Sequence, residues 1–232
     1  MPQNPIRHPS EAAGDGCRSE IAAIVLAAGY STRMQAFKPL LPFGDSTMVE
    51  QVITTLRSVG LETIRVVVGW QAERLIPVVE RDGVLWVQNL RYPEGMYTSV
   101  QAGVRELPGQ VKAFFVLPVD MPLVRRSTLR QLLAAWDVRT KGILYPVWNG
   151  QRGHPPLIDA RYISEILAAP ASVGLRSILA RHSEDARNIE CADPGILRDL
   201  DAPEEYRRAL CEQRGLDAPG QPSGSGDGFP LA

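Results

Sequence analysis

The sequence predicts an α/β fold, a three-layer α/β/α sandwich built on a Rossmann-like, mostly parallel sheet. Short apolar runs rich in β-branched residues alternate along the chain with segments of helical periodicity. Three of these runs are continuously apolar, as expected for strands that helices cover on both faces. At 232 residues, with 44% hydrophobic and 22% charged residues, the chain is long enough for one domain with a sizeable core.

The predicted strands are spaced so that a helix fits between most of them. They are Ile21–Leu26, Ile64–Val68, Val84–Gln88, Ala113–Leu117 and Ile143–Val147. In open parallel sheets ligands bind outside the carboxyl ends of the strands. We therefore expect the functional site among the loops that follow Leu26, Val68, Leu117 and Val147.

Two segments carry clear helix signals. Over Thr47–Val59 the apolar residues form one stripe, the first residue and Glu50 have the spacing of a capping box, and Gly60 supplies the stop. A later helix is predicted around Leu129–Trp136, where apolar residues recur at i, i+3, i+4 and i+7. Ser127 stands where the N-cap of that helix is expected.

The two ends of the chain differ in composition from its middle. Residues 1–20 and 211–232 are rich in Pro, Gly, Ser and charge, so we expect disordered extensions around a folded domain of residues 21–210. A net charge of -1 gives no global attraction to nucleic acid or to an anionic membrane. With 3 widely spaced cysteines and no long apolar run, the sequence favours a cytoplasmic protein.

The loop after the first strand is suited to bind phosphate. Ala27, Ala28 and Gly29 let a ligand approach the main chain, and Gly29 permits a positive φ. Arg33 and Lys38 add two cations in a stretch without acidic residues. The glycine spacing matches neither the Walker loop nor the dinucleotide fingerprint. Taken alone, such a loop is more often a plain strand-to-helix connection that carries two solvated cations.

A family resemblance extends the interpretation of this loop. LAAGYSTRMQAFKPLLPF resembles the LAAGxSxRMGxxKxLLP signature of the MobA-like nucleotidyltransferases, and in particular of the molybdenum cofactor cytidylyltransferases. Further blocks agree in the same order: VVVGW, NLRYPEGMYTSVQAGV, VLPVDMPL, YPVWNGQRGHPPLI and DLDAPEEY. The resemblance covers most of Ile21–Tyr206 and implies a sheet of the nucleotide-diphospho-sugar transferase type. It also implies transfer of CMP from Mg-CTP to the phosphate of a molybdopterin-type cofactor, with release of pyrophosphate.

The resemblance places the nucleotide against two stretches of the chain, the signature loop and the segment that borders the base and ribose. The expected nucleotide-binding residues are Leu26, Ala27, Ala28, Gly29, Arg33, Lys38, Asn89, Gly95, Thr98 and Ser99. The form LAAG, in place of the LAGG of guanylyl-transferring relatives, favours CTP. Arg33, Lys38 and Asp120 are the expected catalytic residues, with Lys38 at the α-phosphate and Arg33 at the leaving pyrophosphate.

Asp120 follows a predicted buried strand, where a fixed carboxylate suits a Mg²⁺ ion that bridges phosphate oxygens. Capping of the next helix is the alternative, and Ser127 is better placed for that. The resemblance makes Asp120 the principal Mg²⁺ ligand, although this chain has Val119 where the family usually has Gly. A second ligand is expected from Asp201 or Asp199.

Asp201 has a structural alternative as well. Pro203 suits the first turn of a helix, and an acid just before that turn is favourable at the helix N-terminus.

The acceptor is expected beside Arg152, Gly153 and His154, because the resemblance places the GHP loop there; a purely structural histidine is the alternative. Where many relatives have GDxGAR, this chain has ASVGLR, residues 171–176, which leaves the acceptor's identity open. A sugar or polyol phosphate is a second candidate acceptor, and a non-catalytic carrier of nucleotide or cofactor is a candidate of another class. A molybdoenzyme or its chaperone is a candidate partner.

Overall fold

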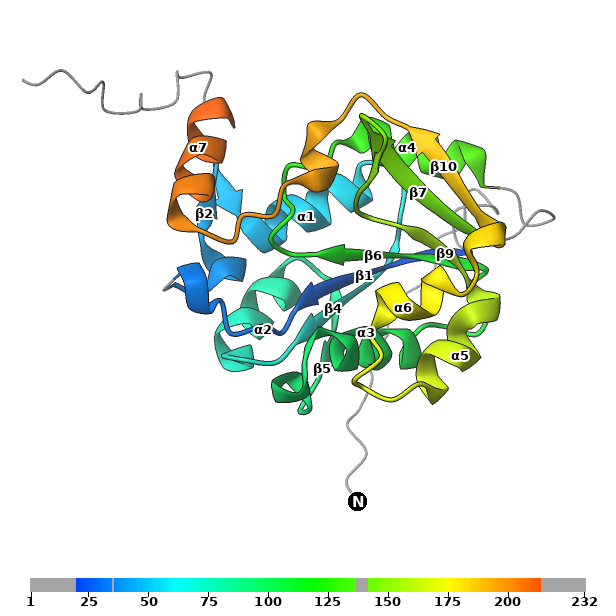
Figure 1. Ribbon diagram of the computed structural model, residues 1–232. Helices are drawn as coiled ribbons and strands as arrows, with labels where there is room; N and C mark the ends of the chain where they lie inside the picture. Colours follow the sequence, from blue (N-terminus) through cyan, green and yellow to red (C-terminus); the bar gives the residue numbers. More distant parts are fainter. Residues whose placement is uncertain (1–19, 35, 137–141, 214–232) are drawn as a thin grey trace, which may run out of the picture.

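The computed structural model describes residues 20–34, 36–136 and 142–213, and a central sheet organises this part of the chain (Figure 1). Its strands are β1 (Ile21–Ala27), β4 (Thr63–Val68), β5 (Leu85–Gln88), β6 (Ala113–Pro118), β7 (Ile143–Trp148), β8 (Gln151–Arg152), β9 (Leu157–Asp159) and β10 (Ala186–Glu190). The order is β10-β7-β9-β6-β1-β4-β5, and β8 pairs with β7. A separate hairpin joins β2 (Pro42–Phe43) to β3 (Ser46–Thr47).

The sheet is mixed but mostly parallel, as predicted. β1 lies between β4 and β6 and pairs with both in parallel, and β5 and β10 also join their neighbours in parallel. β9 is antiparallel to both β6 and β7. The predicted strands are all present with ends shifted by a residue, whereas β8, β9 and β10 were not predicted. The carboxyl ends of the parallel strands share one edge, which is where the cavity described below opens.

Helices cover both faces of the sheet, which confirms the predicted three layers. One layer holds α1 (Met48–Arg57), α2 (Ala72–Arg81) and α4 (Arg126–Ala135), and the other holds α3 (Met96–Arg105), α5 (Ile163–Ala168) and α6 (Leu175–Ala180). Successive β1 residues alternate between the two cores: Ala23 and Val25 pack with the first layer, Ala22 and Ile24 with the second. Short 3₁₀ turns are η1 (Thr32–Met34), η2 (Lys38–Leu40), η3 (Tyr92–Glu94), η4 (Ala160–Tyr162), η5 (Ser183–Asp185) and η6 (Pro194–Leu197).

The start of α1 agrees with its prediction. The Thr47 hydroxyl accepts the backbone N–H of Glu50 at 3.4 Å, and the Glu50 carboxylate accepts that of Thr47 at 2.7 Å, which completes the capping box. The helix ends at Arg57, and Gly60, at φ 85°, donates its N–H to the Arg57 carbonyl at 2.9 Å.

The N-cap of α4 differs from its prediction. Arg125 is the N-cap residue, and Ser127 already lies inside the first turn. The buried carboxylate of Asp193 accepts hydrogen bonds from the Arg125 N–H at 2.8 Å and from the Thr128 hydroxyl at 2.6 Å. A residue far along the chain therefore supplies the helix-terminal acceptor that a local side chain was expected to provide.

The last helix, α7 (Pro203–Gln213), begins at Pro203 as predicted and continues past the expected domain boundary at Leu210. It lies beside the β2–β3 hairpin (Figure 1), and Ala209 shares a small core with Phe43 and Leu200. Of the extensions expected at residues 1–20 and 211–232, residues 1–19 and 214–232 lie outside the described residues. Within the described ranges, no helix is long and apolar enough to cross a membrane.

Candidate active site

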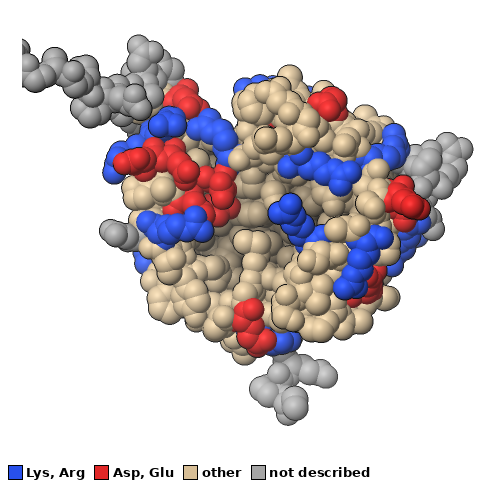
Figure 2. All heavy atoms as spheres, viewed as in Figure 1, with Lys and Arg blue, Asp and Glu red and all other residues tan. Residues whose placement is uncertain are grey.

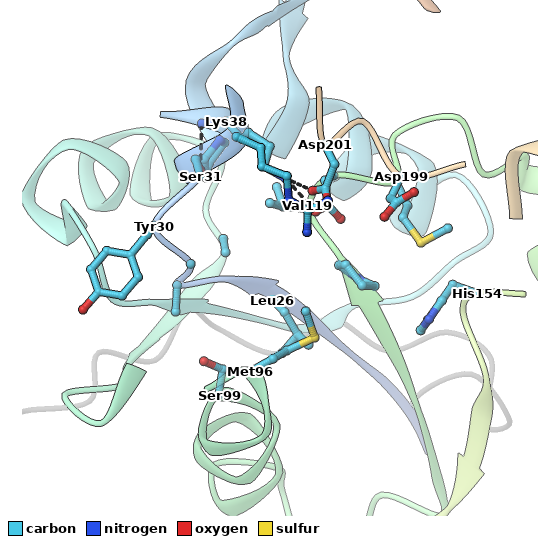
Figure 3. A pocket seen from close by; sticks show the side chains of 18 of the residues that line it. Leu26, Tyr30, Ser31, Lys38, Met96, Ser99, Val119, His154, Asp199 and Asp201 are labelled. Carbon is cyan, nitrogen blue, oxygen red and sulfur yellow. Dashed lines mark hydrogen bonds and ion pairs between the residues drawn. The ribbon is translucent and has the colours of Figure 1, made fainter. Parts of the chain in front are cut away.

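A cavity of about 720 Å³ opens above the carboxyl ends of β1 and β6 (Figures 2 and 3). The chain runs from β1 to β4 and β5 on one side, then returns to place β6 on the other side of β1. This reversal of strand order leaves a crevice in which open α/β sheets bind their ligands. The loops after β1 and β6 line the cavity, as the sequence predicted.

Most of the residues expected from the sequence line this cavity. They are Leu26, Ala27, Ala28, Gly29, Arg33, Lys38, Gly95, Ser99, Asp120, Arg152, Gly153, His154 and Asp201. Asp199, the other candidate for a second carboxylate, also lies on its wall. The topology thus brings residues from distant parts of the sequence to one place.

The backbone of the signature loop differs in one detail from the prediction. Ser31, at φ 55°, is the residue with left-handed backbone, and Gly29 does not adopt a positive φ. The Ser31 hydroxyl accepts the backbone N–H of Lys38 at 3.2 Å, which closes the loop. A Cβ added to Gly29 would meet no atom within 4 Å. Gly29 therefore leaves its main chain open to the cavity, and Ser31 makes the turn.

Two cations and two carboxylates form a cluster in this cavity. Lys38 Nζ donates to Asp120 Oδ2 at 3.0 Å and also to Asp201 Oδ1. Arg33 Nη1 lies 2.8 Å from Asp201 Oδ2. The side chain of Lys38 is 10% exposed and that of Arg33 is 78% exposed. Lys38 is therefore a fixed cation inside the cavity, and Arg33 is a cation free to change partners at its mouth.

The cluster shifts the pKa of two of its members. Burial alone would lower the pKa of Lys38, but the charge of Asp120 and the hydrogen bonds that Lys38 donates to both carboxylates raise it above its ordinary value of 10.5. Burial alone would raise the pKa of Asp201, but Lys38 and Arg33 hold it below its ordinary value of 3.8. Both groups are therefore charged at neutral pH.

Val119 allows Asp120 to reach this cluster. It is 6% exposed, packs in the core, and donates its N–H to the Leu26 carbonyl at 3.0 Å. It does not adopt a positive φ. The backbone at this position therefore accommodates a β-branched residue where the resembled family usually has Gly.

The GHP loop forms the opposite end of the cavity from Tyr30 (Figure 3). Gly153 packs so closely on Ile196 that a side chain there would collide with its carbonyl oxygen. The His154 N–H donates to that same carbonyl at 2.9 Å. The His154 ring is open to the cavity but surrounded by protein, and this desolvation lowers its pKa below the ordinary value of 6.5.

Arg152 is partly engaged by neighbouring strands. Its Nε donates to Asn188 Oδ1 at 2.8 Å, and its guanidinium lies 4.5 Å from the ring centre of Tyr145. These two contacts hold the guanidinium group of Arg152, which contributes positive charge to the wall of the cavity.

Asn89 and Thr98 lie behind the cavity wall and do not line it. Both are buried, and the Asn89 amide donates to the Thr98 and Ser99 hydroxyls at 2.9 Å each. Asn89 Oδ1 accepts the Arg91 N–H at 2.9 Å. Of these residues, Ser99 faces the cavity. Asn89 and Thr98 thus hold the segment that precedes α3, and any contact of theirs with a nucleotide remains a proposal.

Several residues that line the cavity were not predicted from the sequence. Tyr30, Tyr92 and Met96 all border the cavity, and Tyr30 and Met96 are exposed. Their signal was their place within the matching blocks, since Tyr30 lies in the signature loop and the other two lie in NLRYPEGMYTS.

The carboxylates offer a partial cation site. Asp120 and Asp201 both contact Lys38 Nζ, so their oxygens converge on one point. Among the described residues, no group of three or more His, Cys, Asp or Glu side chains is placed to hold a metal ion. Two carboxylate oxygens fit Mg²⁺, which usually keeps several water ligands and binds substrate phosphates.

The fold and the site together define a nucleotide-handling transferase, and comparison with known proteins gives its family. The model of the MobA-like NTP transferase domain matches residues 23–186. The chain therefore belongs to the family of proteins with a MobA-like NTP transferase domain.

Individual relatives are consistent with this family. The chain is 28% identical over 189 residues to the molybdenum cofactor cytidylyltransferase of Escherichia coli strain K12, covering 81% of this chain and 94% of that protein. A nucleotidyl transferase from Methanothermobacter thermautotrophicus has the same fold, with a TM-score of 0.73, 22% identity, and coverage of 84% of this chain and 98% of that one. Rv0371c of Mycobacterium tuberculosis, solved in complex with manganese, has a TM-score of 0.66, 21% identity, and coverage of 83% and 98%.

Proposed function

We propose that this chain transfers CMP from CTP to the phosphate of a molybdopterin-type cofactor and releases pyrophosphate. The observation that carries the proposal is the convergence of Arg33, Lys38, Asp120 and Asp201 in one cavity at the carboxyl ends of β1 and β6. Cations for a triphosphate and carboxylates for its divalent ion are the groups that nucleotidyl transfer needs.

The reaction makes one bond and breaks one. An oxygen of the acceptor phosphate bonds to the α-phosphorus of CTP, and the bond from that phosphorus to the oxygen bridging to the β-phosphate breaks. Pyrophosphate leaves with the electron pair. The attacking phosphate is already an anion at neutral pH, so no side chain has to remove a proton. Catalysis then consists of positioning and charge neutralisation.

The exposure of the two cations supports different roles for them. Lys38, with 10% of its side chain exposed, is held in place and suits the α-phosphate, at which one bond forms and one breaks. Arg33, with 78% exposed, is able to leave Asp201 and follow the pyrophosphate group. The open main chain at Gly29 gives the phosphates room beside these cations.

Asp120 and Asp201 would hold a Mg²⁺ ion, which supplies positive charge at phosphate oxygens when bound. Both carboxylates contact Lys38 Nζ, so their oxygens lie close together in the cavity, and this proximity supports the assignment. Rv0371c, a neighbour in fold, was solved with manganese, and Mn²⁺ shares with Mg²⁺ a preference for carboxylate oxygens.

The choice of substrates rests on sequence likeness. The LAAG form of the loop and the similarity to a molybdenum cofactor cytidylyltransferase favour CTP and a molybdopterin-type acceptor. His154 lies at the other end of the cavity from Tyr30 (Figure 3), and Arg152 lines the same cavity, which supports these two residues as contacts of the acceptor phosphate. A molybdoenzyme or its chaperone would then receive the product.

A substrate panel tests the proposal. The protein is incubated with Mg²⁺, each NTP in turn and either molybdopterin cofactor, a sugar 1-phosphate or a polyol phosphate, and pyrophosphate release is followed together with product mass. We expect turnover with CTP and molybdopterin cofactor, and none from the matched Asp120→Ala protein. Turnover with a sugar or polyol phosphate but not with molybdopterin would contradict the acceptor. Binding of CTP without release of its pyrophosphate in the presence of any of these acceptors would favour a carrier instead of an enzyme.

A further inference from the structure

Tyr30 and Tyr92 line the end of the cavity away from His154, and Trp70 packs against Tyr30 outside the cavity lining. Tyr30 follows β1, Trp70 follows β4, and Tyr92 belongs to η3 after β5. The ring centre of Tyr30 lies 5.3 Å from that of Trp70 and 5.2 Å from that of Tyr92. We call these three residues the aromatic wall. Loops from three neighbouring strands thus place aromatic rings together at one edge of the sheet.

Backbone packing holds the wall in place. The Trp70 N–H donates to the Ala28 carbonyl at 3.1 Å, which ties the loop after β4 to the signature loop. A Cβ added to Gly69 would lie 2.8 Å from the Ala28 Cβ and 3.0 Å from the Tyr92 Cβ. The two loops and η3 therefore touch at Gly69, where a side chain would not fit. This close packing holds the backbone that carries the three rings.

The hydrophobic core does not account for the exposed part of the wall. Tyr30 is 45% exposed and Trp70 is 38% exposed, and neither belongs to the described core clusters. Trp70 is tilted by 48° against Tyr30, and Tyr92 meets Tyr30 edge-on, so neither ring lies flat on a face of Tyr30. A partly open aromatic face at the rim of a cavity is a surface on which a planar ring can stack.

The position of the wall identifies which substrate ring it meets. Figure 3 shows Tyr30 and His154 at opposite ends of the cavity, with Lys38 and Asp201 between them. The phosphates gather at Lys38 and Asp201 in the proposed reaction, so nucleoside and acceptor extend to opposite ends. With the acceptor beside His154, the ring beside Tyr30 belongs to the donor nucleotide.

Two of the polar residues expected near the base do not face the cavity. Asn89 and Thr98, which the family resemblance places near the base, are buried and bonded to each other. Met96, whose side chain is polarisable and suited to contact with rings, lines the same cavity and is 65% exposed. The surroundings therefore favour ring stacking over hydrogen bonding to the base edge.

We propose that Tyr30, supported by Trp70 and Tyr92, stacks on the base of the donor nucleotide and holds the nucleoside in the cavity. This inference rests on the proposed function for the direction in which the nucleotide lies. Stacking uses the face of the ring and not its edge, so it contributes affinity for any nucleotide base and is not by itself the source of selectivity for CTP.

Titration calorimetry with two probes tests the proposal. Mg-CTP carries the ring, and Mg-tripolyphosphate carries the phosphates without one. We expect Tyr30→Ala to weaken Mg-CTP binding about tenfold and to leave tripolyphosphate binding unchanged. Tyr30→Phe keeps the ring and should bind like the wild type. Leu85→Ala removes another exposed apolar side chain, on β5 and outside the cavity lining, and is the matched control.

Two results would overturn the stacking role: CTP binding that survives Tyr30→Ala, or an equal loss of CTP and tripolyphosphate, which would indicate a displaced loop. A loss of affinity for molybdopterin cofactor with CTP binding intact would assign the wall to the acceptor and also overturn the proposal. Turnover by the wild type reports on the proposed function separately. If the wild type binds CTP through Tyr30 but transfers nothing, the transferase proposal fails and the stacking role of the aromatic wall is still supported.

Discussion

The backbone N–H of Leu200 donates to the backbone carbonyl of Asp120 at 2.8 Å. This bond fastens the segment that precedes α7 to the loop after β6. Asp201, the next residue, thereby reaches Lys38 together with Asp120, while Asp199, the preceding residue, lies towards His154 (Figure 3). The aspartate that joins the charged cluster is therefore the one that directly follows this main-chain contact.

The two aspartates should therefore respond differently to substitution. We expect Asp201→Asn to lower kcat on the order of a hundredfold, because it removes one of two carboxylates at the proposed cation site. Asp199→Asn removes an equal charge from the same cavity and should change kcat little. Pyrophosphate release at saturating CTP measures both. A larger loss from Asp199→Asn would transfer the proposed metal role to that residue.

Removal of divalent metal should weaken nucleotide binding strongly. The carboxylates of Asp120 and Asp201 balance the charges of Lys38 and Arg33, so the cluster alone has little net attraction for a triphosphate. With EDTA present we expect the Kd for CTP to rise at least about tenfold. Calorimetry with and without EDTA measures the change.

Asp120→Asn provides the control for this measurement. It removes one negative charge, so its CTP affinity should depend less on the metal than that of the wild type. Equal affinity of the wild-type protein for CTP with and without divalent metal would argue against the cation site.

Features encoded by local runs of residues were predictable. The apolar run at β1, the capping box at Thr47 and the small residues of the signature loop each depend on neighbours in the sequence. The loop's match to a known signature then brought in Asp120, which the sequence alone places only after a strand. Local pattern and resemblance together identified the layers of the fold and many of the residues that line the cavity, but not Tyr30, Tyr92 or Met96.

Features that depend on contacts between distant segments were not predictable. β9 is three residues long and inserts between β6 and β7, so its apolar pattern is too short to mark a strand. The loop geometry places the positive φ at Ser31, not at Gly29, because the turn is set by the hydrogen bond to Lys38. The trio of Tyr30, Trp70 and Tyr92 exists only once three strand ends are brought side by side.

The N-cap of α4 gives a direct test of a distant contact against a local one. Asp193 is buried and accepts hydrogen bonds from the Arg125 and Gly195 N–H groups and from the Thr128 hydroxyl. Asp193→Ala leaves these donors without their acceptor, and we expect a loss of about 2–4 kcal/mol in the free energy of unfolding. Ser127→Ala, at the position that local sequence favoured, should cost less than about 0.5 kcal/mol. Urea denaturation of both variants measures the difference, and equal losses would mean that Asp193 is not the cap.

The capping box of α1 should make stability depend on pH in the acidic range. The hydrogen bonds from Thr47, followed by the pairing with Arg81, hold the pKa of Glu50 below its ordinary value of 4.5 despite partial burial. A carboxyl group with a lowered pKa binds protons less readily in the folded state than in the unfolded state. Its stabilising effect is therefore complete above pH 4.5 and is lost as the pH falls through the lower folded-state pKa.

Glu50→Gln isolates this contribution, because the amide oxygen can still accept the Thr47 N–H without titrating. We expect the variant to be less stable than the wild type at pH 7, by about 1 kcal/mol, and the difference to shrink as the pH falls below 4.5. Urea denaturation at a series of pH values measures it. A difference that stays constant from neutral to acidic pH would show that the charge of Glu50 adds nothing to the cap beyond its hydrogen bonds.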